Sequence, residues 1–139
     1  MDQPASFSVR AAAARSTRTL DGAKVTNARL NEPYRRELHH SVVETCRALI
    51  DGRAGPVEVS RRLVALAHEL GADRDEDFVY FVGLDSETDH FPLGESRQHW
   101  SAAALAREDA KRAKYDVAAH ADAAQRCRNL LLKYEQGAV

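Results

Sequence analysis

The 139-residue chain is poor in cysteine, proline and aromatic residues, with two cysteines, four prolines and 6% aromatics. Two cysteines without metal-ligand spacing exclude a disulfide framework and a structural zinc site as organising devices. Cys46 and Cys127 both fall within apolar helical patterns. We therefore expect free, buried, reduced thiols, with a single disulfide as the alternative.

The sequence also lacks a long apolar run. Its apolar segments are far shorter than the roughly 18 residues that a membrane span requires. The first ten residues, MDQPASFSVR, contain an early aspartate and no apolar core of a secretory signal. Hydrophobic residues make up 44% and charged residues 29%, as in ordinary soluble proteins. We predict a cytoplasmic protein.

The sequence lacks a basic stripe with interleaved aromatics, and its most concentrated charge is acidic. The net charge is only −1, yet residues 72–95 hold eight acidic residues against one basic residue, Arg74. Nucleic-acid binding would require a basic stripe with interleaved aromatics, so no nucleic-acid partner is expected. A concentrated negative charge favours a basic protein partner.

Residues 1–30 show neither helical nor strand periodicity, and we expect a loosely held N-terminal arm ahead of a single helical domain over residues 31–139. The sequence Asn31-Glu-Pro predicts the start of a first helix, which Asp51-Gly52 ends. A second helix is predicted from Gly55-Pro56 to Gly71. The short link between the two favours an antiparallel pair.

Acidic residues ahead of Phe78 predict a short helix over residues 76–84, although the alternation of apolar residues there also permits a strand. The last helix is predicted from an N-cap at Ser101 through Tyr134, with Trp100 as a core residue that packs beside its start. Its alanine-rich first half either packs closely or breaks near residues 118–120.

The predicted fold is all-α: a small helical bundle with an antiparallel pair, a turn-rich acidic connector and a long C-terminal helix. The inward positions predicted for the last helix are Leu105, Ala106, Ala110, Ala113, Val117, Ala124, Cys127, Leu130, Leu131 and Tyr134.

The densest polar cluster is Asp85-Ser-Glu-Thr-Asp-His90, directly after the apolar run. It does not form a calcium loop, because His90 stands where a glycine is required. One histidine, with His99 nine residues further on, is a poor donor set for zinc or iron. The structural interpretation is that Ser86, Thr88 and Asp89 cap a helix end and fix a turn. We predict no metal and no cofactor.

The segment RRLVALAHELGADRDEDFVYFVGLDSETDHFPLGESRQHW, residues 61–100, resembles a bacterial family of small proteins of unknown function. The resemblance extends over about residues 40–135 and leaves out the N-terminal arm. Small helical proteins with a turn like Ser86-Glu-Thr-Asp-His-Phe-Pro92 also resemble immunity proteins of bacterial toxin systems. This second resemblance implies a cytoplasmic, protein-binding role. The motif positions are His68, Glu69, Phe78, Phe81, Asp85, Ser86, Glu87, Thr88, Asp89, His90, Pro92, Gly94, Arg97 and Trp100.

These observations favour a non-enzymatic module that neutralises a bacterial toxin through an acidic surface. One alternative is a small metal-dependent or acid–base enzyme, in which Glu87 pairs with Asp85 or Asp89 and His90 and His99 assist. Another is a structural module that forms homodimers through the last helix. The predicted partner-binding residues are Asp73, Asp75, Glu76, Asp77, Asp85, Glu87, Asp89, His90 and Phe91.

Overall fold

The structure, a computed structural model, describes residues 31–135. The chain divides into two compact units between Arg36 and Glu37. The predicted N-terminal arm, residues 1–30, lies outside the described residues. Its order and the domain boundary at residue 30 stay predictions.

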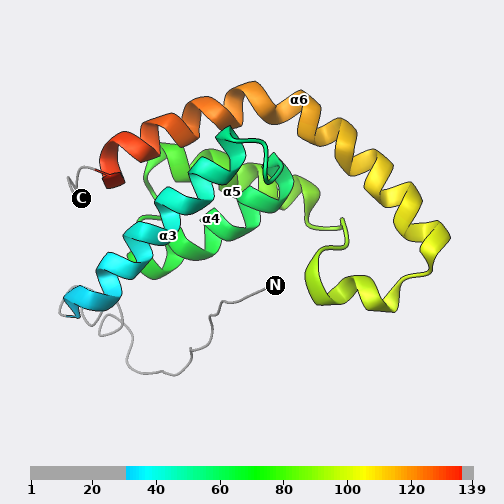
Figure 1. Ribbon diagram of the computed structural model, residues 1–139, viewed down its shortest axis with the longest axis horizontal. Coiled ribbons are helices and arrows are strands. Elements are labelled where there is room, and N and C mark those ends of the chain that lie inside the picture. Colours follow the sequence, from blue (N-terminus) through cyan, green and yellow to red (C-terminus); the bar gives the residue numbers. More distant parts are fainter. Residues whose placement is uncertain (1–30, 136–139) are drawn as a thin grey trace. The chain divides into compact units, whose positions relative to one another are not determined.

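The described chain is helical throughout, with turns and short links but no strand between residues 31 and 135. The all-α prediction is confirmed, and the helix interpretation of residues 76–84 is correct. None of the helices in this range has the length and apolar composition needed to cross a bilayer. The elements are α3 (Glu32–Ile50), α4 (Pro56–Leu70), α5 (Glu76–Thr88), the 3₁₀ helix η2 (Gly94–His99) and α6 (Ala102–Glu135) (Figure 1).

A side chain from α6 caps the start of α4. Gly55 is the N-cap residue and offers no side chain, so the backbone N–H of Val57 donates instead to Oδ1 of Asp116, 2.9 Å away. A Cβ atom at Gly55 would lie 2.5 Å from Oδ2 of the same aspartate. A larger residue here would therefore displace the carboxylate that caps the helix. At the other end of α4, Gly71 adopts a left-handed conformation (φ +69°) and ends the helix, as predicted.

The hydrophobic core is formed by α3, α4, α5 and the second half of α6. Cys46 and Cys127 are both buried and free, as predicted, and they lie in this core. A hydrogen bond between the two thiols, together with burial, raises the pKa of Cys46. The largest fully buried side chains include Phe78, Phe81, Leu49, Leu63 and Leu130.

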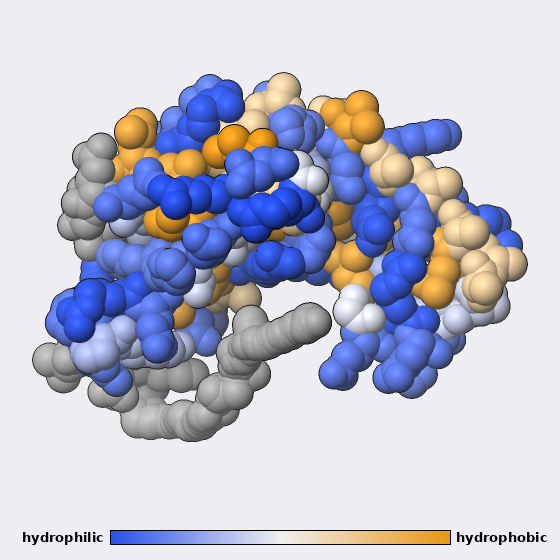
Figure 2. All heavy atoms as spheres, in the orientation of Figure 1, coloured by the Kyte–Doolittle hydropathy of each residue, from blue (hydrophilic) through white to orange (hydrophobic). Residues whose placement is uncertain are grey.

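The two halves of α6 differ in burial. Burial on α6 begins at Ala123, and the preceding turns are exposed or half-buried. The prediction that Ala106, Ala110, Ala113 and Val117 face inward is wrong: all four are exposed, and Val117 is 80% exposed. Alanine forms helix on its intrinsic propensity, so its spacing does not require a core. Figure 2 shows light-orange residues along this part of the α6 arc, which continues through residues 118–120 without a break.

Candidate partner-binding surface at the ends of α5

The acidic cluster ahead of Phe78 starts α5. Asp75 is the N-cap residue, and its Oδ1 accepts a hydrogen bond of 2.8 Å from the backbone N–H of Asp77. Glu76 and Asp77 occupy the first turn, where negative charge opposes the positive end of the helix dipole. The local sequence thus explains both the start of the helix and part of its acidity.

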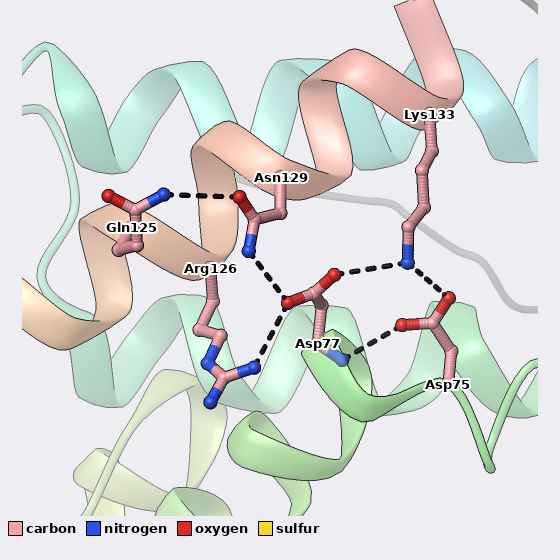
Figure 3. A network of polar contacts seen from close by, with 6 residues as sticks. All are labelled: Asp75, Asp77, Gln125, Arg126, Asn129 and Lys133. Atoms are coloured by element: carbon pink, nitrogen blue, oxygen red, sulfur yellow. Dashed lines mark hydrogen bonds and ion pairs between the residues drawn. The ribbon is translucent and has the colours of Figure 1, made fainter.

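Asp77 is also the centre of an ionic network that joins α5 to α6 (Figure 3). Its side chain is only 4% exposed. Nη1 of Arg126 and Nδ2 of Asn129 donate to its Oδ1 at 3.1 and 3.0 Å. Nζ of Lys133 donates to its Oδ2 at 3.0 Å and to Oδ2 of Asp75 at 2.6 Å. The network therefore neutralises two of the predicted surface acids.

The network keeps Asp77 and Lys133 ionised. Burial raises the pKa of Asp77, but hydrogen bonds from Asn129, Lys133 and Arg126 lower it more, so it lies below its usual range. Burial lowers the pKa of Lys133, but the two aspartates raise it above its usual range. Charges held in this way stabilise the contact between α5 and α6 and are not available to a partner.

The other end of α5 extends further than predicted, because residues 85–88 are helical. Thr88 is buried, and its hydroxyl donates to the carbonyl of Leu84 at 2.7 Å. Arg61 of α4 donates to the carbonyls of Thr88 and Phe91 at 2.6 and 2.8 Å, and its Nε lies 3.5 Å from Oδ1 of Asp85. Thr88 thus makes a local side-chain to backbone bond, as predicted, but this bond lies within the last turn of α5 and does not cap its end. The carbonyls of Thr88 and Phe91 are bound by Arg61 instead.

The connector after α5 is fixed by its own contacts. Pro92 is buried, and Gly94 has a positive φ of +61°, which favours glycine. The guanidinium of Arg97 makes a bidentate ion pair with Asp109 of α6, at 2.8 and 2.9 Å, and this ion pair lowers the pKa of the Asp109 carboxyl. Trp100 is 39% exposed, so its predicted role as a core residue is wrong.

Ser101 caps α6 as predicted. Its hydroxyl accepts a hydrogen bond of 3.1 Å from the backbone N–H of Ala104.

The nine predicted partner-binding residues therefore separate into three groups. Asp75, Asp77 and Asp85 are in ion pairs with cations of α4 and α6. Phe91 is 3% exposed and packs edge-on against Tyr115, with 5.9 Å between ring centroids, so it cannot anchor a partner at the surface. The exposed residues are Asp73 and Glu76 at the start of α5 and Glu87, Asp89 and His90 at its end.

Glu87, Asp89 and His90 form what we term the α5 C-terminal surface. In the described part of the chain, no ion pair involves Glu87 or Asp89, and the ring of His90 lies 4.2 Å from that of Phe91. Asp73, by contrast, lies 3.4 Å from Nδ1 of His68. Between residues 31 and 135, no three His, Cys, Asp or Glu side chains are arranged to hold a metal ion.

Sequence reasoning missed the cations that pair with these acids. Arg126, Asn129 and Lys133 are spaced by three and four residues, which places their side chains on one face of α6 beside apolar positions. That polar stripe beside the buried positions of the second half of α6 was a usable signal. Arg61 gave none, because it is one of two adjacent arginines in α4 and only the fold shows which one faces α5.

No curated protein and no solved structure matches the chain significantly. A family description, "Protein of unknown function (DUF2489)", matches residues 5–130. The match begins well before residue 40, so the family region includes most of the segment that we predicted as an arm. Since it covers most of the sequence, the chain belongs to this family, DUF2489.

Proposed function

We propose that this protein is a non-enzymatic binding module that neutralises a bacterial toxin, in the manner of an immunity protein, through an acidic surface. The observation that carries the proposal is the contrast between acids in α5. Asp77 and Asp85 are matched by cations of the same chain. Glu87 and Asp89 are exposed, and no ion pair is made to either among the described residues.

The surface that holds these acids is built from fixed contacts. Arg61 binds the carbonyls on both sides of Asp89, and Arg97 joins the following turn to α6. A charged group on such a support loses little conformational freedom when it is bound. Preorganised, unpaired charge is more useful for recognition than for stability, because exposed charges contribute little to folding.

A basic target explains why the charges are negative. Toxins that cleave nucleic acids need basic surfaces for the phosphate backbone, and an acidic inhibitor is attracted to such a surface before contact. Acidic side chains also exclude partners with the same charge. The expected complex therefore forms quickly at low salt and more slowly as ionic strength rises.

The test uses the full chain as bait in a lysate of its source organism, compared with a Glu87→Lys/Asp89→Lys variant. A Glu44→Lys variant, in an exposed position on α3, controls for the change in net charge. We expect wild type and the Glu44 variant to retain one stoichiometric protein that the double variant loses. Co-expression of the retained protein with each variant then measures protection of cell growth.

Two results contradict the proposal. One is a retained partner whose affinity for the double variant equals that for wild type. The other is a retained partner that does not inhibit growth when it is produced alone.

A second candidate, self-association through α6, is favoured by the exposure of Val117 and of the alanines that precede it at helical spacing. An exposed apolar stripe of this kind is a common element of helix pairing. Sedimentation equilibrium of wild type and of Val117→Lys tests this function. A monomeric wild type excludes it, and a dimer that the lysine disrupts supports it.

A further inference from the structure

A groove lies between α5 and the middle of α6 and encloses about 410 Å³. We propose that this groove binds an amphipathic helix of the partner protein, with an apolar side chain in the groove and a lysine or arginine beside Glu87. The inference rests on the proposed function and assigns part of the partner contact to it. The residues that line the groove are Val79, Tyr80, Gly83, Leu84, Glu87, Tyr115, Ala118 and Ala119.

The glycine at position 83 is the first observation that indicates a group bound in the groove. It lies in the interior of α5, where glycine is less favourable than alanine. It has no positive φ, and a Cβ atom built on it meets nothing within 4 Å. Nothing in the described part of the chain therefore explains the glycine. A group that approaches the α5 backbone from outside would explain it.

The groove is also apolar and open at the surface. Val79 is 48% exposed and Tyr115 is 37% exposed, although both are large apolar or aromatic side chains. Ala118 and Ala119 line the α6 side, so small residues are present on both helices. Small residues allow a third helix to approach closely, because the distance between packed helices depends on the side chains at their contact. This geometry fits a helix better than it fits an extended strand, which would need a free sheet edge.

The charges around the groove identify the chemistry of the occupant. Glu87 is the one lining residue that is charged at neutral pH. Tyr80 is half-buried, which raises its pKa, and the nearby carboxylate of Asp122 raises it further. Arg126, whose guanidinium lies 5.7 Å from the centre of the Tyr80 ring, is engaged with Asp77. The groove therefore has negative charge at its edge and suits a cationic helix.

The experiment selects peptides from a phage-displayed library of random 16-residue sequences on the purified full chain. The enriched peptides should carry aliphatic residues at helical spacing and at least one lysine or arginine beside them. Their affinity is measured for wild type and for three variants: Gly83→Leu, which fills the groove, Glu87→Lys, and the control Glu44→Lys. We expect about a tenfold or greater loss for the first two and no loss for the control.

Gly83→Ala provides an independent test in the free protein. If the glycine has no role within the chain, alanine raises the melting temperature by about 2–6 °C, because it favours helix. A lower melting temperature would show that the glycine serves the fold itself, which overturns the argument. Absence of enriched peptides, enrichment of peptides without basic residues, or equal binding to Gly83→Leu would also overturn it.

The outcomes separate the groove from the proposed function. A cellular partner that is lost with Glu87→Lys/Asp89→Lys but binds Gly83→Leu as well as wild type leaves the function intact and excludes the groove. A partner indifferent to the charge reversal contradicts the function itself. A wild-type dimer that Gly83→Leu converts to a monomer would identify the occupant as a second copy and overturn the assignment to a partner.

Discussion

The two ends of α5 carry similar acidic sequences but use their charges differently. At the start of the helix, Asp77 is nearly buried and is surrounded by three donors from α6. At its end, Glu87 and Asp89 are exposed and no ion pair is made to either among residues 31–135, whereas Arg61 pairs with the neighbouring Asp85. A cluster that is acidic in sequence is therefore partly neutral in space.

This difference shows which acidic residues can be changed to alter binding without unfolding the protein. Reversing a buried, paired charge destroys the fold before it affects a partner, because an uncompensated charge remains in the interior. Reversing an exposed, unpaired charge leaves the fold unchanged and alters only the surface. Charge changes at the start of α5 should therefore lower stability, whereas charge changes at its end should lower binding and leave stability unchanged.

The largest expected effect is at the start of α5. Asp77→Ala leaves Arg126, Asn129 and Lys133 without their shared acceptor and should lower the free energy of unfolding by about 2–4 kcal/mol. Asp77→Asn keeps the shape and some hydrogen bonds and should cost less. Urea denaturation followed by circular dichroism measures both. A loss below about 1 kcal/mol for the alanine variant would show that the network does not support the fold.

Acid pH tests the same network without a mutation. The pKa of Asp77 is lower in the folded protein than in the unfolded chain, where it is about 3.9. Its contribution to stability is therefore complete above about pH 5 and is lost as the pH falls through the folded-state pKa. Unfolding free energies measured from pH 6 downward should decline more steeply for wild type than for Asp77→Asn. Parallel curves would contradict this assignment.

A smaller effect is expected where α4 supports the end of α5. Arg61→Ala removes two hydrogen bonds to the carbonyls of Thr88 and Phe91 and the ion pair to Asp85, and should cost about 1–3 kcal/mol. Hydrogen exchange should show that protection is lost first in residues 85–92. Arg62→Ala, which removes only an exposed pair with Glu58, is the matched control and should cost less than about 1 kcal/mol.

Asp116 is a third kind of acid, one that caps a helix of another segment. Gly55→Ala places a Cβ atom where the carboxylate lies, and either this change or Asp116→Ala should cost about 1 kcal/mol through loss of the cap. The two changes remove the same interaction, so the double variant should cost little more than one of them. Full additivity in thermal unfolding would show that the glycine and the aspartate act separately.

The helices were predictable because local residues mark their ends. Ser101 supplies a side-chain cap, Gly71 a left-handed turn and Asp75 a bond to the first turn of α5. These signals lie within a few residues of the ends they mark, so periodicity and capping rules find them. The end of α5 was placed too early because the polar residues 85–88 resemble a loop, whereas Arg61 and Thr88 stabilise a last helical turn.

The candidate surface was only partly predictable, because pairing depends on residues far apart in sequence. Lys133 and Asp75 are separated by 58 positions, and Arg126 and Asp77 by 49. The local charge of residues 72–95 could not show that cations so distant in sequence pair with the acids of this segment. Nor could hydrophobicity alone show that Phe91 is buried against Tyr115, since an exposed anchor and a core residue have the same sequence signature.

The smallest expected effect on stability is at the end of α5, and it is the sharpest test of the comparison. Glu87→Lys/Asp89→Lys should change the free energy of unfolding by no more than about 0.5 kcal/mol, because both side chains are exposed and no ion pair holds either within the described residues. The urea protocol used for Asp77→Ala provides the measurement, with Glu44→Lys as the control for net charge. A loss comparable to that of Asp77→Ala would mean that these acids also serve the fold. An unfolding free energy close to that of wild type would mean that the fold does not need these two acids. A surface used for recognition is expected to have this property.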